Sequence, residues 1–161
     1  MFDKPLLEFR LDATPFGPRA PELLRAAVAC FAVPLLSPGP CAAALLTQDG
    51  EIHASLTEVI GREACRHAVS MAVNRMLRTP ERRILMVAVV RRAEDASFQL
   101  ILPCGACRML LHAYGGREIR IVRVCDFQPT LNIVSLNELL PFAEGGAGRN
   151  IPLEMLEKPQ E

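Results

Sequence analysis

The sequence has no excess of charge of either sign, because 18 Lys and Arg residues balance 18 Asp and Glu residues. Without an excess of positive charge, the chain has little electrostatic attraction for a polyanion. A nucleic-acid polymer is therefore not an expected partner, and a small, weakly charged molecule fits this composition better.

Long apolar runs are missing as well. No stretch approaches the roughly 20 apolar residues of a membrane-spanning helix, and the first residues show no secretory signal pattern. We therefore expect a soluble, cytoplasmic protein with no membrane partner. The length of 161 residues suits a single domain with a real core.

Strand and helix patterns alternate along the chain, which predicts a layered α/β domain. An Asp-Gly pair at residues 49–50 predicts a hairpin turn, a continuous apolar run at 84–90 predicts a strand buried on both faces, and Ser135 with Glu138 predicts a helix cap. The expected helices are 21–33, 61–78, 104–114 and 136–142, and the expected strands are 41–47, 52–56, 84–90, 98–102 and 118–124, with partial strand character at 130–136.

The segment Pro103-Cys104-Gly105-Ala106-Cys107-Arg108 places two thiols between a predicted strand and the first turn of a predicted helix. Unpaired N–H groups and the helix dipole lower the pKa of a thiol at this position, which favours the thiolate that metals bind. The same pattern also describes a thioredoxin-like redox pair. A third ligand would decide between a metal site and a redox pair.

Cys65 is the candidate for that third ligand. It lies in Glu63-Ala64-Cys65-Arg66-His67, at what we expect to be the first turn of the helix over residues 61–78. Three thiolates from Cys65, Cys104 and Cys107 would suit an open catalytic zinc site with one position left for water.

These motifs resemble the cytidine deaminase superfamily, whose small members carry Cys-Ala-Glu followed by Pro-Cys-x-x-Cys-Arg. Residues 41–52 are similar to the first hairpin of that family, and residues 136–142 to its closing helix. The resemblance implies a three-layer α/β/α fold with a mixed sheet of about five strands in residues 20–145, between an N-terminal arm (1–19) and a C-terminal tail (146–161). It also implies bound Zn²⁺, a small-molecule substrate, and a homodimer or homotetramer.

One position departs from the family pattern. The Glu that carries protons in the family stands two residues after the first zinc Cys, where this chain has His67. His67 could accept and donate protons itself, could be a fourth zinc ligand that closes the site, or could point past the metal.

The resemblance therefore leaves two functions open. The first is a zinc-dependent, deaminase-like hydrolase that acts on a small amino-heterocycle or nucleoside-like compound, with an altered proton shuttle and substrate pocket. The second is a catalytically inactive, zinc-stabilised homologue with a binding or structural role.

Four further residues are site candidates on the same resemblance. Glu58 would take the place of the family's ribose-binding carboxylate and could share in catalysis, and Gly39 falls where the family has the aromatic residue that stacks on the base. Arg66 and Arg108 flank the expected ligands and would supply positive charge beside the thiolates.

Overall fold

The computed structural model describes residues 19–32, 40–59, 65–124 and 131–140, with backbone alone at 59, 65, 66, 124 and 131. The predicted tail (146–161) and the predicted arm (1–19), apart from its last residue, lie outside the described residues. The helices are α1 (Ala20–Ala29), α2 (Ala68–Met76), α3 (Gly105–Gly115) and α4 (Leu136–Leu139), with 3-10 turns η2 (Cys30–Ala32) and η3 (Gly116–Glu118). The strands are β1 (Cys41–Thr47), β2 (Ile52–Leu56), β3 (Glu58–Val59), β4 (Cys65–Arg66), β5 (Ile84–Arg92), β6 (Phe98–Ile101), β7 (Arg120–Val124) and β8 (Leu131–Ser135).

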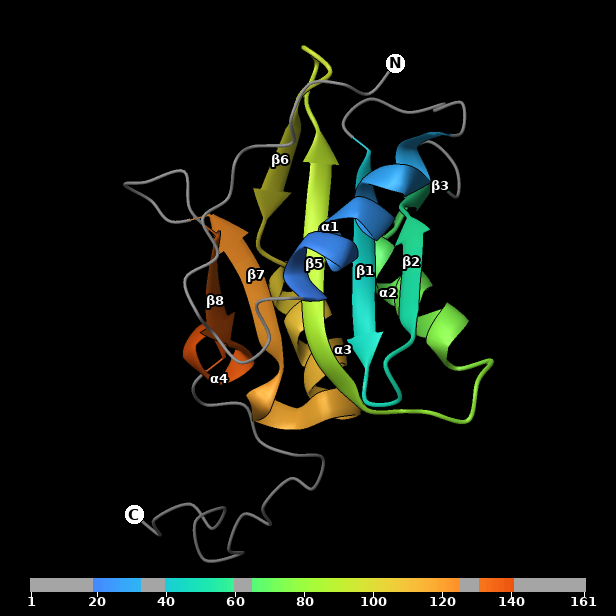
Figure 1. Ribbon diagram of the computed structural model, residues 1–161, viewed down its shortest axis with the longest axis vertical. Helices are drawn as coiled ribbons and strands as arrows, with labels where there is room; N and C mark the ends of the chain where they lie inside the picture. The colour runs from blue at the N-terminus through green and yellow to red at the C-terminus, as the bar shows by residue number, and fades with distance from the viewer. Residues whose placement is uncertain (1–18, 33–39, 60–64, 125–130, 141–161) are drawn as a thin grey trace, which may run out of the picture.

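Six of these strands form one mixed sheet in the order β2-β1-β5-β7-β8, with β6 also paired to β5. The central strand β5 is antiparallel to β1 and parallel to β7. Its other neighbour, β6, pairs with residues 89–92, whereas β7 pairs with residues 86 and 87. Because β1 occupies the opposite edge, β6 and β7 follow one another along a single edge of β5 (Figure 1).

The sheet is covered on both faces, as the uninterrupted apolar run of β5 predicted. Met86, Ala88 and Val90 belong to the core beneath α1, whereas Val87 and Val89 belong to the core beneath α2 and α3. Figure 1 shows α1 in front of the sheet and α2 and α3 behind it. The predicted three-layer α/β/α arrangement is therefore confirmed, with six strands rather than about five in the main sheet.

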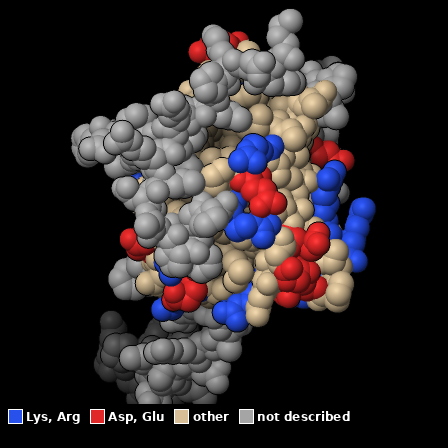
Figure 2. Space-filling view, in the orientation of Figure 1, with Lys and Arg blue, Asp and Glu red and all other residues tan. Residues whose placement is uncertain are grey.

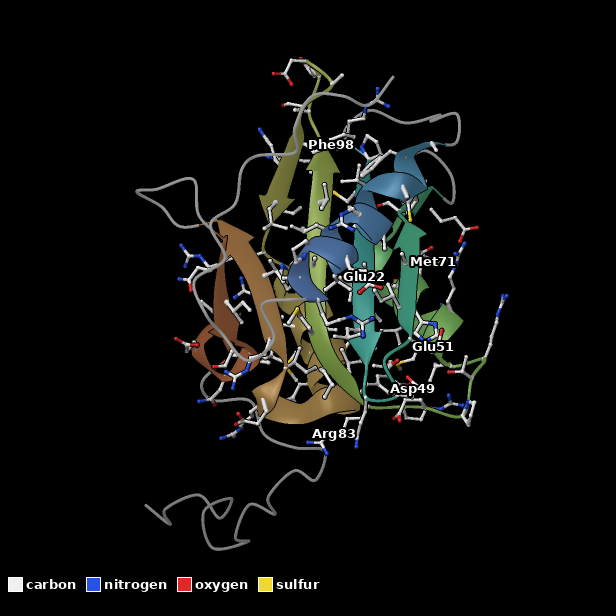
Figure 3. All side chains as sticks on the ribbon, in the orientation of Figure 1. Glu22, Asp49, Glu51, Met71, Arg83 and Phe98 are labelled. Atoms are coloured by element: carbon white, nitrogen blue, oxygen red, sulfur yellow. The ribbon has the colours of Figure 1, made fainter. Side chains whose placement is uncertain are left out.

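The predicted hairpin is also confirmed, and its turn is fixed to α1. Gly50 has a positive φ of 88°, which favours glycine at this turn position. Arg19 donates a hydrogen bond to the carbonyl of Gly50 and forms an ion pair with Glu22 of α1. Figure 3 shows Glu22 on α1 and the turn residues Asp49 and Glu51 at the end of the hairpin.

The predicted starting residue of the second helix was wrong. Instead of beginning near residue 61, α2 begins at Ala68, and Cys65 lies in β4 rather than in a helical turn. The reason is that β4 pairs antiparallel with β3, Cys65 opposite Val59 and Arg66 opposite Glu58. That pairing uses backbone groups that a longer helix would have needed.

The C-terminal elements follow their sequence signals. Gly116 ends α3 with a φ of 69°, a conformation that favours glycine at a helix end. Residues 131–135, expected to have partial strand character, form β8 against β7. The capping box at α4 is present, since Ser135 and Glu138 bond each other's backbone N–H groups.

Charges of both signs are mixed on the surface. Figure 2 shows basic and acidic side chains side by side over the face that carries α1. In the part of the chain that the structure describes, no helix is long and apolar enough to cross a membrane.

Candidate metal centre

Two helix N-termini meet behind the sheet, and each presents a metal-binding side chain. His67 is the residue that precedes α2 and Cys104 the residue that precedes α3, and both have extended backbone. Cys107 follows in the first turn of α3. Helix N-termini carry partial positive charge and unpaired N–H groups, so both helices favour anionic ligands such as thiolates at this point.

The three side chains point their donor atoms at one another. The Nδ1 atom of His67 lies 3.2 Å from Sγ of Cys104 and 3.3 Å from Sγ of Cys107. All three donor atoms lie within 4.8 Å of one another. Tetrahedral zinc with Zn–S bonds of about 2.3 Å and Zn–N bonds of about 2.0 Å places N and S roughly 3.5 Å apart. The His-Cys-Cys group therefore has the donor types and nearly the spacing of a zinc site.

The two thiols differ in their titration. Partial burial raises the pKa of Cys104, but N–H groups of Cys107 and Ala106 and the Cys107 thiol bond its sulfur and bring that pKa below its ordinary value. Burial, with the hydrogen bond and the charge of Cys104, raises the pKa of Cys107 to about 12. The thiolate form is therefore favoured at Cys104 and disfavoured at Cys107. A divalent cation among the three donors would supply positive charge that favours the thiolate form of both residues.

A cavity of about 280 Å³ opens over the His-Cys-Cys group. Its volume lies near the lower end of the range for small-molecule sites. Cys41 at the start of β1, Val89 of β5 and Ile101 of β6 contribute to its wall. Its described walls are Cys41, Thr57, His67, Ala68, Val69, Val89, Ile101, Leu102, Pro103, Cys104 and Cys107.

Arg108 holds the loop that carries Cys104. Its Nε donates to the carbonyl of Pro103 at 2.8 Å, and another guanidinium nitrogen donates to the carbonyl of Leu139 at 3.1 Å. Pro103 directly precedes Cys104, so this side chain fixes the approach of the chain to the metal-binding group and joins it to the end of α4. The sequence predicted that Arg108 supplies positive charge beside the thiolates, and in the structure its guanidinium group is hydrogen-bonded to two backbone carbonyls.

The structure brings only part of the predicted site together. Glu58 is exposed on β3 and does not line the cavity. The backbones of Cys65 and Arg66 lie in β4, and their side chains are outside what the structure describes. Gly39 also falls outside the described residues. The roles predicted for these four residues remain predictions.

Sequence reasoning missed several wall residues, most notably Val69. Val69 stands two positions after His67, is 2% exposed, and lines the cavity. If His67 is a metal ligand, Val69 occupies the position at which the family pattern has its Glu. One feature of the sequence could have revealed this arrangement: His67, like Cys104, directly precedes an apolar helical stretch.

The structure is that of an α/β protein in which three side chains that could hold a metal ion meet at the start of two helices. No protein-family model matches the sequence, and no curated protein matches it either. Solved structures do match. The cytidine deaminase from Mycobacterium leprae is 25% identical with a TM-score of 0.61, and the match covers 75% of this chain and 96% of that one.

Two further cytidine deaminases give the same result. The Burkholderia pseudomallei structure is 27% identical with a TM-score of 0.62, and the match covers 78% of this chain and 98% of the other. The Bacillus anthracis structure has a TM-score of 0.65 at 19% identity, over 76% and 87% of the two chains, and bears on the fold alone. The chain has the cytidine deaminase fold, as its motifs predicted, with a His-Cys-Cys group that could hold zinc.

Proposed function

We propose that the protein is a zinc-dependent, deaminase-like hydrolase that acts on a small amino-heterocycle or nucleoside-like compound. The observation that carries the proposal is the His-Cys-Cys group in the wall of a cavity of about 280 Å³. The cytidine deaminase fold of the chain supports the same reaction class. Two further parts of the proposal rest on the sequence: location in the cytoplasm, from the lack of a signal pattern and of long apolar runs, and assembly into a homodimer or homotetramer, from the family resemblance.

In this proposal His67, Cys104 and Cys107 hold the ion. A zinc ion there would supply Lewis acidity and would lower the pKa of water enough for attack on an amino-bearing carbon. The N-termini of α2 and α3 stabilise the negative charge of the thiolates. The apolar side chains of the walls would contact the ligand and displace water from that side of it.

A proton carrier is still needed, and a metal-bound His67 could not serve as one. Glu58 directly follows the cavity residue Thr57 and is exposed. We assign the proton-carrying role to Glu58 in the ligand-bound protein, since catalytic hydrogen bonds often form only once the ligand is present. Replacement of Glu58 by Gln should then lower turnover by about a hundredfold or more without loss of zinc.

A second function is favoured by Val69. A buried apolar side chain at the place of a proton carrier suits a cavity that binds a molecule over the metal without hydrolysing it. The two functions are separated by an ammonia-release assay on the zinc-loaded full chain, with aminopyrimidines, aminopurines and their nucleosides as substrates. Zinc-dependent ammonia release that Glu58→Gln abolishes supports the hydrolase. Ligand binding without release supports the second function.

A further inference from the structure

The described wall of the cavity is apolar everywhere except at the metal-binding group and at one hydroxyl. Its apolar members are Cys41, Ala68, Val69, Val89, Ile101, Leu102 and Pro103. Among the lining residues that the structure describes there is no carboxylate, no amide, no Lys and no Arg. A bound molecule would therefore meet few polar side chains besides the His-Cys-Cys group, Thr57 and, in the proposed function, Glu58.

The single hydroxyl, on Thr57, is already engaged. It donates to the carbonyl of Cys41 at 3.1 Å, and the backbone N–H of Thr57 donates to the same carbonyl at 2.8 Å. The hydroxyl proton is thus committed to the start of β1. Towards a ligand, Thr57 can act only as an acceptor.

The position of the apolar residues also matters. Val89 and Ile101 lie opposite each other in the β5–β6 pair, and Val69 lies in the first turn of α2. Val69 and Val89 are 2% and 5% exposed, so they are firmly packed in the core as well as bordering the cavity. These side chains cannot turn away to admit polar groups without opening the core.

We infer that the molecule bound over the metal is a neutral, flat heterocycle without a sugar or a charged substituent, a free base rather than a nucleoside. This inference rests on the proposed function and names its substrate class. Sugar hydroxyls in this cavity would lose hydrogen bonds to water, and apart from the His-Cys-Cys group the described side chains of the wall offer them a single acceptor, the Thr57 hydroxyl. A carboxylate or phosphate substituent would lose still more.

The test uses the full chain loaded with Co²⁺ in place of zinc, so that ligand binding at the metal is read from the visible spectrum. Two matched pairs of probes are titrated: cytosine with cytidine, which differ by the ribose, and 4-methylpyridine with isonicotinate, which differ by a negative charge. We expect the first member of each pair to bind at least about tenfold more tightly than the second. Equal or tighter binding of cytidine, or no spectral response to either base, would overturn the inference.

A pair of valine variants tests the role of the wall itself. Val69 and Val73 lie one turn apart on α2, both 2% exposed, but only Val69 lines the cavity. Val69→Thr should reduce the preference for cytosine over cytidine severalfold, whereas Val73→Thr should leave that ratio unchanged. If both variants leave the ratio unchanged, or both change it alike, Val69 does not set the preference and the inference falls.

Failure of the proposed function has a different readout. If the chain takes up neither Zn²⁺ nor Co²⁺, its metal content shows this before any probe is added. Both the proposed function and the inference about its substrate are then wrong. A chain that binds the metal and releases ammonia, but prefers cytidine, overturns this inference alone.

Discussion

His67 and Cys104 occupy the same position in two different helices: each is the extended residue that directly precedes the first helical turn. Their donor atoms lie 3.2 Å apart although the residues are 37 positions apart in sequence. Two helix ends thus converge on one point behind the sheet. Any cation bound there would link α2 to α3, so metal binding and folding of this layer should depend on each other.

The ligand set is tested by metal content. His67→Ala, Cys104→Ser and Cys107→Ser each remove one described donor, and we expect zinc to fall from about one ion per chain to a small fraction, as measured by elemental analysis. Cys30→Ser is the matched control, because Cys30 is a half-buried thiol at the end of α1, away from the cavity.

The Cys65→Ser variant tests whether Cys65 is also a zinc ligand. Three described donors suffice for an open site, so we expect this variant to keep its zinc. Loss of zinc would instead make Cys65 a ligand, as the sequence predicted. With His67 also bound, the site would then be closed and structural.

A carboxylate placed at Val69 should change the chemistry of the cavity. Val69→Glu puts a group able to carry protons two positions after His67, in a buried place that raises the pKa of a carboxyl group towards neutrality. We expect ammonia release from cytosine to rise at least about tenfold over the unmodified chain. Val69→Gln has nearly the same size but no base, and should give no gain. An equal gain in both variants would show that shape, not proton transfer, limits the reaction.

Arg108 should support both the metal site and the fold. Its guanidinium bonds the carbonyls of Pro103 and Leu139, and Arg108→Ala leaves both without this donor. We expect the free energy of unfolding to fall by about 1–3 kcal/mol and zinc affinity to fall by about tenfold or more. Arg108→Lys should recover only part of each loss, because an ammonium group cannot reproduce the planar fork. The exposed Arg25 of α1 supplies the control, since Arg25→Ala should change neither quantity.

Two glycines of α3 give opposite predictions for the same substitution. A Cβ on Gly115 would lie 2.5 Å from side-chain atoms of Ile119 and 2.6 Å from the carbonyl of Ile84, whereas a Cβ on Gly105 would meet no atom within 4 Å. Gly115→Ala should therefore lower the free energy of unfolding by about 1–3 kcal/mol. Gly105→Ala should be neutral or should stabilise the helix by up to about 1 kcal/mol. Urea unfolding of the two variants checks both, and similar values would contradict the packing at Gly115.

The cap of α4 should make stability depend on pH. The backbone N–H and the hydroxyl of Ser135 bond the Glu138 carboxylate and lower its pKa from the ordinary value of 4.5. A depressed folded-state pKa means that the stabilisation is present above pH 4.5 and is lost as the pH falls through the folded-state value. Unfolding midpoints of the unmodified chain and of Glu138→Gln should differ at neutral pH and converge in acid. A constant difference from pH 7 to pH 3 would exclude this role.

The parts of the fold that local chemistry decides could be predicted from the sequence. The Asp49-Gly50 turn, the continuous apolar run of β5 and the end of α3 near Gly116 each depend on neighbours within a few residues. The start of α2 could not be predicted in this way, because residues 65–66 pair with β3, whose residues lie six and eight positions earlier in the sequence. Pairing energy between separate segments overrode the helical pattern that residues 61–67 show by themselves.

For the candidate site, the sequence predicted which residues take part better than it predicted what each of them does. Cys104 and Cys107 were recognised from the order of strand, thiols and helix, and the structure brings them together with His67. The role of His67 depended on where α2 begins, and the apolar wall depended on how Val69, Val89 and Ile101 meet in three dimensions. Neither is encoded in spacing along the chain.

The shared edge of β5 has a consequence for the order of folding. The chain between β6 and β7 contains α3, and β7 pairs with β5 next to β6 along the same edge, so we expect α3 to form before β7 pairs. Cys104 and Cys107 are 37 and 40 positions away from His67 in sequence, so we expect these three residues to come together late in folding. In refolding experiments, metal uptake should therefore be slower than formation of the β1–β2 hairpin, and a cobalt spectrum that develops last would report the completed domain.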